Sequence, residues 1–598
     1  MGVPFACGLL SLAYGADANW DLFHTHLYNP YAWLNGRLDT DLAPAGMQSY
    51  FNPLLDVPYY WMSLHWFAPL VGFIMGLMHG LNFVLVLGIA RLVIPALPDE
   101  DRHRLPLLLA LAGCLTANFL SVLGNSMGDA TTAVLVLAAL WLVFRSWPAI
   151  QSLERGAWSP LFVAGTLAGL AAGLKLTNAV YALAFCLAFF TLPLARVKRL
   201  RVAFLFGVGV VAGLALTGGY WFWLMWERFH NPLFPMFSVL FPNPLTRPLG
   251  IGDPSWLPKG VLETLFWPFI FSWNSHRVGQ AHLRQFIWAL VYTLFWWWAI
   301  RTARRRFQER HPGHTEPRIL YLIAAVMLSY FIWMKLFSIA RYLVPIELLT
   351  PLLVFVLLRE LVPYVKARRA AAWALTTASG VVLLGGVSTW GHEPWAKNMF
   401  RVESPAIADA DKTTVFMVGN EASPTWLSVF LPKQLSFIGL AESFPESKYY
   451  AQRVREMVAE RGGPIYAVVP GHRNLRADNV TRAQTWIERA ELNHGETRCA
   501  MLDWVVGHLH LHAGVQHGVS ADGGMSCRLE VLPEDMEDLG AENRASAAAY
   551  ARLLVRYKYA LDPASCTQYQ AYVGATVYPY QWCQVEDTGK RAQEKTGG

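Results

Sequence analysis

Charged residues are scarce in this chain. Asp, Glu, Lys and Arg together make up 15% of its 598 residues, whereas an ordinary soluble domain carries about 25%. The deficit is uneven, because long apolar runs dominate the first two thirds and charges are spread through the remainder. One uniform core would not divide the chain in this way. The pattern predicts a membrane domain, 1–390, then a soluble domain, 391–585, and a disordered tail, 586–598.

Signatures of nucleotide and nucleic-acid binding are also missing. Residues 391–598 contain no G-x-G-x-x-G string, no P-loop and no Ser/His/Asp elbow. The net charge is +7, but much of it sits in short basic loops between apolar runs, and no basic stripe with interleaved aromatics occurs. Basic residues at the ends of membrane spans usually mark the cytoplasmic side instead. These absences exclude nucleic acid as a partner.

Cysteine is rare, and its seven occurrences divide by region. Three lie in apolar runs, where a thiol is usually a small core residue. The soluble part holds Cys499, Cys527, Cys566 and Cys583. An even number in a polar domain fits disulfides and an oxidising compartment, although free thiols in a cytosolic domain fit the count equally well. Pairing nearest neighbours in the sequence predicts Cys499–Cys527 and Cys566–Cys583.

Apolar runs near the length of a membrane span are abundant. A helix that crosses the hydrocarbon needs about 20 mostly apolar residues, and about eleven runs approach this length. The first run is short and lacks a basic n-region, so it does not predict a signal peptide. The runs cover residues 3–15, 69–96, 105–123, 129–147, 158–173, 176–195, 202–224, 284–302, 318–335, 342–358 and 371–390.

Basic residues fall on alternate connections between these runs and so orient the chain. The clusters lie at 102–104, 145–155, 196–201, 301–310 and 366–369. Placing them in the cytoplasm puts segment 16–68, the long loop 225–283 and the C-terminal domain on the other side, which is also the compartment that disulfides require. We expect a multi-pass protein of the inner (plasma) membrane whose soluble domain is periplasmic.

The first outer segment, 16–68, is acidic and rich in aromatics, which suit helices lying at the membrane interface. Its polar residues include Asp17, Asp21, Asp39, Asp41, Asp56, His24, His26, Gln48 and Asn52. Asp17 and Asp21 are spaced i, i+4, so in a helix they would share one face. Two close carboxylates raise one another's pKa and poise a general base. Solvated loop acids or helix caps are the alternative, but a dense cluster at a membrane exit favours function.

Short motifs around these acids resemble those of the GT-C glycosyltransferases. The acid after the first span is followed by Tyr28, Ala32, Leu34 and Gly36-Arg37, and later by Tyr50-Phe51-Asn52-Pro53. Over residues 1–360 the layout is most similar to bacterial relatives of the protein mannosyltransferases and lipid A aminoarabinose transferases. The resemblance implies a polyprenyl-phosphate sugar donor and a catalytic acid in this segment. The paired acids of the motif appear here as separated acids, so Asp21 and Asp17 both stay candidates. Asp21 is preferred because Asp17 lies nearer the helix end.

Later turns supply a second acid and candidate phosphate ligands. Asp129, in Asn125-Ser126-Met127-Gly128-Asp129, matches the place of a second acid in GT-C enzymes, or it caps the following helix. Lys175 either snorkels to the interface or holds a phosphate. Arg341-Tyr342, followed by Pro345, resembles the Arg-Tyr entrance of GT-C enzymes, where the guanidinium meets the carrier phosphate. Lys335 is a further phosphate candidate.

The remaining polar side chains expected on the outer side are assigned to substrate binding, with a solvated loop position as the alternative for each. They are His24, His26, Tyr28, Gln48, Asn52, Asn125 and His276.

The C-terminal part alternates short β-rich runs with helical runs, which predicts a layered α/β domain. Strands are expected at 415–418, 435–438 and 465–469, and helices near 479–492 and 541–560. His508, His510 and His512 alternate along a predicted strand and share one face, but further zinc ligands in register are not evident. The domain is expected to cover the active site or to recognise the acceptor.

These features predict an inverting membrane glycosyltransferase. Asp21, alone or with Asp17, takes a proton from a glycan, lipid or protein acceptor while the carrier phosphate leaves in a direct displacement. Phosphate is already a good leaving group, so no cofactor is required, and a divalent metal is compatible but not indicated. The alternatives are a polymerase or ligase of lipid-linked glycans, and a transporter or flippase, for which no clear inverted repeat is found. A non-catalytic receptor would leave the clustered aspartates unexplained.

Overall fold

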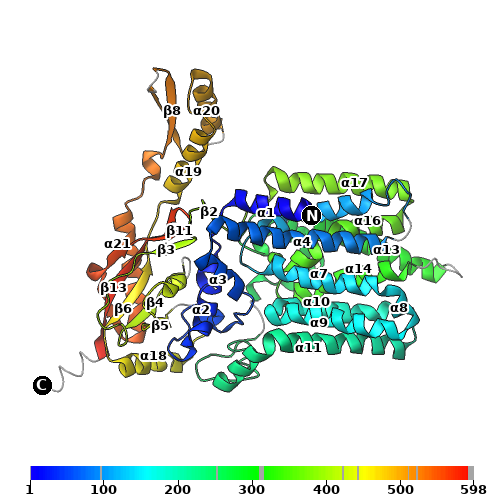
Figure 1. The fold of residues 1–598 in the computed structure, drawn as a ribbon, viewed down its shortest axis with the longest axis horizontal. Helices are drawn as coiled ribbons and strands as arrows, with labels where there is room; N and C mark the ends of the chain where they lie inside the picture. Colours follow the sequence, from blue (N-terminus) through cyan, green and yellow to red (C-terminus); the bar gives the residue numbers. More distant parts are fainter. Residues whose placement is uncertain are drawn as a thin grey trace.

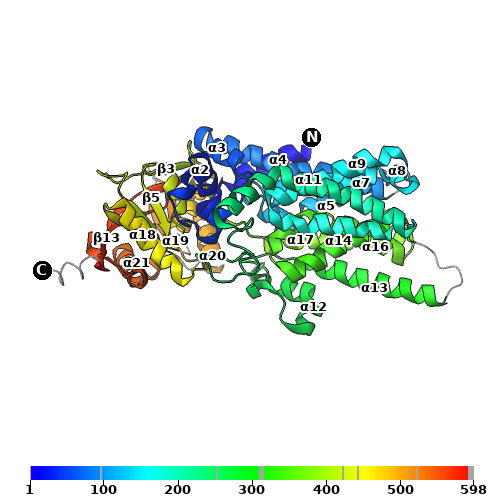
Figure 2. The ribbon, with the colours of Figure 1, turned by 90° about the horizontal axis from the view of Figure 1, so that it is seen from below.

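The computed structural model describes residues 2–94, 97–250, 254–308, 315–419, 423–440, 444–508, 511–519 and 523–589. A long helical bundle carries a strand-containing domain at one end (Figure 1). The view turned by 90° shows the same arrangement, with helices of the bundle running lengthwise and the strands gathered at the far end (Figure 2).

Each apolar run predicted from the sequence contains a helix. The helices of the bundle are α1 (Gly2–Tyr14), α4 (Ala68–Val93), α5 (Arg104–Cys114), α6 (Ala117–Ser121), α7 (Asp129–Arg145), α8 (Trp147–Ser152), α9 (Trp158–Leu174), α10 (Ala179–Ala188), α11 (Arg196–Phe229), α12 (Gly260–Trp273), α13 (Phe286–Gln308), α14 (Pro317–Leu336), α15 (Val344–Glu347), α16 (Thr350–Leu361) and α17 (Tyr364–Val381).

Three helices of the described chain are long and apolar enough to cross a membrane: α4, α11 and α14. The segments Ala340–Glu347 and Thr350–Leu361 pass the same test together but are bent by 58°. Several other apolar helices are shorter than a full span. A multi-pass membrane protein is therefore supported, whereas the predicted number of spans is not confirmed.

Helices α9 and α11 pack unusually closely because glycines face each other across their contact. A Cβ on Gly169 would lie 2.1 Å from the carbonyl oxygen of Val210, and one on Gly213 would lie 2.1 Å from that of Thr166. Small residues at such spacings let membrane helices approach backbone to backbone. The Asn52 amide donates to carbonyl oxygens of both helices, at 2.9 and 2.8 Å, so this pair anchors the first outer segment.

The first outer segment lies between the bundle and the C-terminal domain (Figure 1). It contains β1 (Ala16–Asp17), the π-helical turn η1 (Leu22–His26), α2 (Tyr28–Leu34), η2 (Arg37–Asp39), η3 (Gly46–Tyr50) and α3 (Val57–His65). Strand β1 pairs antiparallel with β2 (His392–Glu393), which immediately follows the last helices of the bundle. The segment is thus fixed from both sides.

The C-terminal domain is built on a mixed six-stranded sheet with the order β10-β13-β6-β4-β5, in which β9 also pairs with β13. The strands are β4 (Thr414–Met417), β5 (Ser436–Gly439), β6 (Ile465–Pro470), β9 (Tyr559–Leu561), β10 (Thr567–Tyr569) and β13 (Tyr580–Asp587). Strands β5, β4 and β6 are parallel and match the three predicted strands. Helices α18 (Lys448–Arg461) and α21 (Leu539–Leu554) pack beside the sheet (Figure 1).

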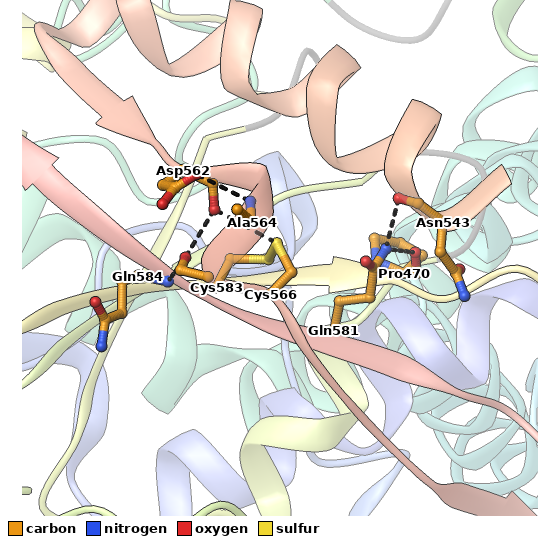
Figure 3. The surroundings of a disulfide bond; sticks show 9 residues. Pro470, Asn543, Asp562, Ala564, Cys566, Gln581, Cys583 and Gln584 are labelled. Carbon is orange, nitrogen blue, oxygen red and sulfur yellow. Dashed lines mark hydrogen bonds between the residues drawn. A yellow bond between two sulfur atoms is a disulfide. The ribbon is translucent and has the colours of Figure 1, made fainter. Parts of the chain in front are cut away.

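Two disulfides form with the predicted pairing. Cys499–Cys527 joins α20 (Glu496–His508) to β8 (Met525–Glu530), which forms a hairpin with β7 (Gly514–Val519). Together with α19 (Leu475–Arg489), these elements project from the sheet (Figure 1). Cys566–Cys583 fastens the chain before β10 to the middle of β13 (Figure 3).

Two predictions for this domain are wrong. His508 ends helix α20 instead of lying on a strand, and His512 contacts Asp535 at 3.0 Å, while His510 lies outside the described residues. No group of three or more potential metal ligands occurs in the described ranges. The predicted tail also starts too early, since Glu586 and Asp587 pair with β9 as part of β13. Residues 590–598 lie outside the description.

Candidate active site

The C-terminal domain docks onto the first outer segment through a buried ion pair. The Arg37 guanidinium donates to both carboxylate oxygens of Asp41, at 2.7 and 2.6 Å. The Tyr28 hydroxyl and the Phe437 amide also donate to Asp41, at 3.0 and 2.9 Å. Leu42 extends this contact by bridging to the edge of the sheet at Ile438. Tyr28, a predicted substrate residue, therefore supports the docking contact.

Asp17 fastens the first outer segment to the turn before α7. One carboxylate oxygen accepts from the Ser126 amide at 2.7 Å, and the other accepts from the Asn19 side chain and backbone at 2.7 and 3.2 Å. Asp17 is only 2% exposed. Because both oxygens are engaged, its geometry suits positioning of the turn better than proton transfer.

Asp17 and Asp21 do not lie on one helix face, contrary to the sequence expectation. Asp17 belongs to strand β1, and Asp21 is the residue before the π-helical turn η1. The backbone must be extended at Asp17 to pair with His392 of β2, so the i, i+4 helical relation is lost.

Asp21 instead contacts Arg341. The Arg341 guanidinium donates to the Asp21 carboxylate at 2.5 Å across 320 positions of sequence. Arg341 lies in η9 (Ala340–Leu343), within the first segment of the bent pair. Its guanidinium carbon is 5.4 Å from the ring centres of both Tyr342 and Trp390, a cation–π arrangement on two sides. The aromatic rings hold the cation in place beside the acid.

A second ion pair lies beside the first. The Lys175 ammonium donates to the Asp129 carboxylate at 2.6 Å and to the Met127 carbonyl at 2.8 Å. Arg341 approaches the other oxygen of Asp129 at 3.9 Å. Each carboxylate oxygen of Asp129 therefore faces a cation. Asp129 is also the first residue of helix α7. The structure brings together two acids and two cations that come from four separate segments.

The pKa of Asp21 is lowered, not raised. Burial opposes ionisation, but Arg341, then His26 and Lys175, outweigh it and lower the pKa. Asp21 is therefore an ionised and weakly basic carboxylate while Arg341 contacts it. The expectation that neighbouring aspartates raise its pKa is wrong, because the close neighbours are cations.

The two histidines of η1 differ in charge state. Burial lowers the pKa of His24 to about 4, so His24 is neutral near pH 7. Its ring stacks on Trp20 with centres 4.2 Å apart, and Nδ1 lies 2.9 Å from the Ser423 hydroxyl. Burial also opposes charging of His26, but the Asp56 carboxylate, 2.7 Å from Nδ1, raises its pKa overall. His26 therefore favours the protonated form.

Several predicted site residues play other parts. Asn52 anchors the segment to the bundle, and the Asn125 side chain accepts from the Met127 amide at 3.1 Å. The backbone carbonyl of Gln48 accepts from Asn29 at 2.8 Å. Lys335 lies in the last turn of helix α14 with an exposed side chain, and it joins none of the ion pairs of the described chain. His276 is exposed in η8 (Ser275–Arg277).

Sequence reasoning missed two residues of the site. Trp390 lies against the Arg341 guanidinium, and its only signal was an aromatic residue at the end of the last apolar run. Asp56 was counted among the clustered acids, but nothing in the sequence paired it with His26.

Comparisons with known proteins give distant likenesses. No family model matches the chain, and no curated protein matches its sequence. Among solved structures, ArnT from Cupriavidus metallidurans bound to undecaprenyl phosphate is 14% identical with a TM-score of 0.44, covering 90% of this chain and 97% of that one. The oligosaccharyltransferase AglB from Archaeoglobus fulgidus, in complex with an inhibitory peptide and a dolichol-phosphate, is 12% identical with a TM-score of 0.41, covering 90% and 74%.

Proposed function

We propose that this chain is a membrane glycosyltransferase of the GT-C type, which transfers a sugar from a polyprenyl-phosphate donor to an acceptor outside the cytoplasm. The observation that carries the proposal is the 2.5 Å contact between Asp21 and Arg341. It joins a candidate base to a candidate phosphate ligand in one small cluster. The neighbouring Lys175–Asp129 pair adds a second cation at the same place.

The donor phosphate is recognised by exchange of partners. Arginine presents a planar fork that binds phosphate oxygens in pairs, and lysine acts as a mobile point charge. In the structure each cation is neutralised by a carboxylate, Asp21 for Arg341 and Asp129 for Lys175. An arriving phosphate competes with Asp21 for the guanidinium. Once Arg341 turns to the phosphate, Asp21 loses its strongest counter-charge and becomes more basic.

Transfer then proceeds by a single displacement. The acceptor hydroxyl or amine attacks the anomeric carbon while Asp21 takes its proton. The bond between that carbon and the phosphate oxygen breaks, and its electron pair stays on the phosphate beside Arg341 and Lys175. Attack from the face opposite the leaving group inverts the configuration of the sugar. No cofactor takes part in these steps.

The disulfides and the basic connections support a site on the outer side of the membrane. Cys499–Cys527 and Cys566–Cys583 belong to the domain that docks on the site, and stable disulfides form outside the cytoplasm. Among the basic connections, Asp101 contacts Arg368 at 2.6 Å. This contact places the basic cluster 102–104 beside the cluster 366–369. We assign the site and the C-terminal domain to the periplasmic face of the inner membrane, where the acceptor is a cell-envelope glycan, lipid or protein.

One observation favours a second candidate. The bent pair Ala340–Glu347 and Thr350–Leu361 has the form of a broken span or of a re-entrant loop, and broken spans occur at the binding sites of transporters. A flippase for lipid-linked sugars would move its substrate without breaking a glycosidic bond. The two functions therefore differ in whether the donor is consumed.

The test uses purified full-length protein in lipid nanodiscs. A panel of radiolabelled polyprenyl-phosphate hexoses and pentoses is supplied with cell-envelope lipids and glycans as acceptors. Glycosyl transfer predicts label in the acceptor, an equal amount of free polyprenyl phosphate, and an inverted anomeric centre by NMR. The same protein is also reconstituted into vesicles with the same donors. Donors that cross the vesicle bilayer unchanged would favour the flippase, and donors that are neither consumed nor moved would reject both functions.

A further inference from the structure

His26 and Asp56 form an aspartate–histidine pair next to Asp21. Asp56, the residue before helix α3, holds Nδ1 of His26 at 2.7 Å, and the two side chains are 8% and 15% exposed. Both ring nitrogens are buried and neither makes a hydrogen bond among the residues that the structure describes, so Nδ1 meets Asp56 as an ion pair and Nε2 has no polar partner. A carboxylate this close to one imidazole nitrogen favours a proton on it, and the other nitrogen is left for chemistry.

The π-helical turn η1 brings His26 toward the side of the chain that carries Asp21. An α-helix has about 3.6 residues per turn, so a residue five positions further on points well away. A π-helical turn is wider and closes with i→i+5 hydrogen bonds, and single π turns recur at functional sites. Asp21 precedes this turn and His26 ends it, so the wider turn draws these two side chains together.

The groups that act on His26 come from three segments. Asp56 lies on one side, Asp21 belongs to the same turn, and Lys175 comes from the end of α9. His24, also in the turn, is neutral near pH 7. Burial and Lys175 oppose protonation of His26, but the two carboxylates outweigh them. The raised pKa favours the protonated form of His26, beside the cations that face the phosphate in the proposed reaction.

We propose, on the basis of the proposed function, that His26 is the general acid that protonates the departing phosphate through Nε2. As the bond from the anomeric carbon to the phosphate oxygen breaks, the electron pair goes to that oxygen, which takes the Nε2 proton. Meanwhile the acceptor proton passes to Asp21. His26 ends neutral with its Nδ1 proton facing Asp56, and transfer of the proton from Asp21 to His26 restores the starting state. The products are the glycosylated acceptor and polyprenyl hydrogen phosphate.

The chemistry of the leaving group suits such an acid. The donor phosphate is a diester with one negative charge, whereas the released monoester acquires a second ionisation with a pKa of about 6. Proton transfer is most effective when acid and acceptor have similar affinities for the proton near the working pH. An imidazole meets this condition, and Asp21 cannot serve as the acid because it must be ionised to accept a proton.

The test is the pH dependence of kcat for transfer. A group that must be protonated makes kcat fall as pH rises through its pKa, so the wild type should lose activity on the alkaline side. His26→Gln should lower kcat by about 10²–10⁴-fold and abolish this alkaline limb. Asp56→Asn removes the main group that raises the pKa of His26, so its alkaline limb should move to lower pH. His65→Gln, an exposed position on α3, is the matched control and should keep both rate and profile.

The possible failures can be told apart. An alkaline limb that stays in place in both His26→Gln and Asp56→Asn would overturn the role of His26 and leave the proposed function intact. If His26→Gln does not fold, as judged by its melting curve, the shift in Asp56→Asn decides alone. A wild-type protein that transfers no sugar at any pH would overturn the proposed function and this inference together.

Discussion

Asp21 and Arg341 lie 320 positions apart in the sequence and touch at 2.5 Å. The contact joins the turn after the first helix to the first segment of the bent pair, Ala340–Glu347. It has a direct consequence for mechanism, because an aspartate held by a guanidinium is a weak base until another anion takes the guanidinium away. In the proposed reaction, the basicity of Asp21 is thereby tied to the arrival of the donor phosphate.

Replacement of Asp21 by Asn should abolish transfer with little change in fold. The amide cannot accept the acceptor proton, and loss of a general base typically lowers kcat by about 10²–10⁴-fold. Asp39→Asn is the matched control, because Asp39 belongs to the same segment but its side chain is 73% exposed in a surface pair with Arg228. Initial rates and melting temperatures of both variants check the prediction. Full activity in Asp21→Asn would reject Asp21 as the base.

Replacement of Arg341 by Lys should weaken donor binding although the charge is kept. Lysine cannot bind phosphate oxygens in pairs and loses stacking on Tyr342 and Trp390. Loss of one hydrogen bond to a charged group corresponds to about 1.5–3 kcal/mol, so we expect a fall in kcat/KM of about 10–100-fold. The measurement is steady-state kinetics with the donor as the varied substrate. A KM for donor equal to that of the wild type, with unchanged kcat, would contradict the assignment.

Lys175 and Asp129 should behave as a coupled pair. Asp129 is only 4% exposed, so Lys175→Met leaves a buried carboxylate with a weaker partner. Breaking such a pair typically destabilises a protein by about 3–5 kcal/mol, whereas removing both charges is better tolerated. Lys175→Met should therefore melt at lower temperature than the double variant Lys175→Met/Asp129→Asn. If the shifts in melting temperature of Lys175→Met and Asp129→Asn alone add up to the shift of the double variant, the pair is not coupled.

His24 should make folding sensitive to mild acid. Its pKa falls from 6.5 to about 4 on burial, so the unfolded chain binds a proton more readily than the folded protein. Below pH 6.5 protonation therefore favours unfolding, and the effect is complete near pH 4. His24→Gln removes this contribution, so its melting temperature should fall less than that of the wild type between these pH values. Parallel curves for the two proteins would contradict the prediction.

The two disulfides provide a test of topology. In intact cells, the four disulfide cysteines should react with a membrane-impermeant maleimide only after reduction, whereas Cys7 and Cys114 are buried in the bundle and should stay unlabelled. Mass spectrometry of labelled peptides identifies the sites. Labelling of these four positions without reduction, but only after the cells are lysed, would place the C-terminal domain in the cytoplasm.

Much of the helical part is predictable from the sequence, because a membrane helix needs one continuous apolar run and leaves that signature along the chain. The three parallel strands are visible for a similar reason, since short buried strands are continuously apolar. Arg341 and Lys175 stand out because a cation among apolar residues needs a partner. The sequence does not show that the partners are Asp21 and Asp129, because that depends on how distant segments pack.

The failures of sequence reasoning have physical causes. Asp17 was expected on a helix because the i, i+4 spacing fits one, but pairing with β2 imposes an extended backbone there. The position of His26 near Asp21 depends on a π-helical turn, and we find no signature of this turn in the sequence alone. Tyr28 and Arg37 resemble active-site residues in the motif, yet their contacts with Asp41 hold the C-terminal domain.

The most direct measurement is an experimental structure of the protein with a polyprenyl phosphate bound in a lipid nanodisc. We predict that the phosphate contacts the Arg341 guanidinium and the Lys175 ammonium, that Asp21 is released from Arg341, and that Nε2 of His26 faces a phosphate oxygen. A phosphate bound elsewhere, with the Asp21–Arg341 contact unbroken, would contradict the account.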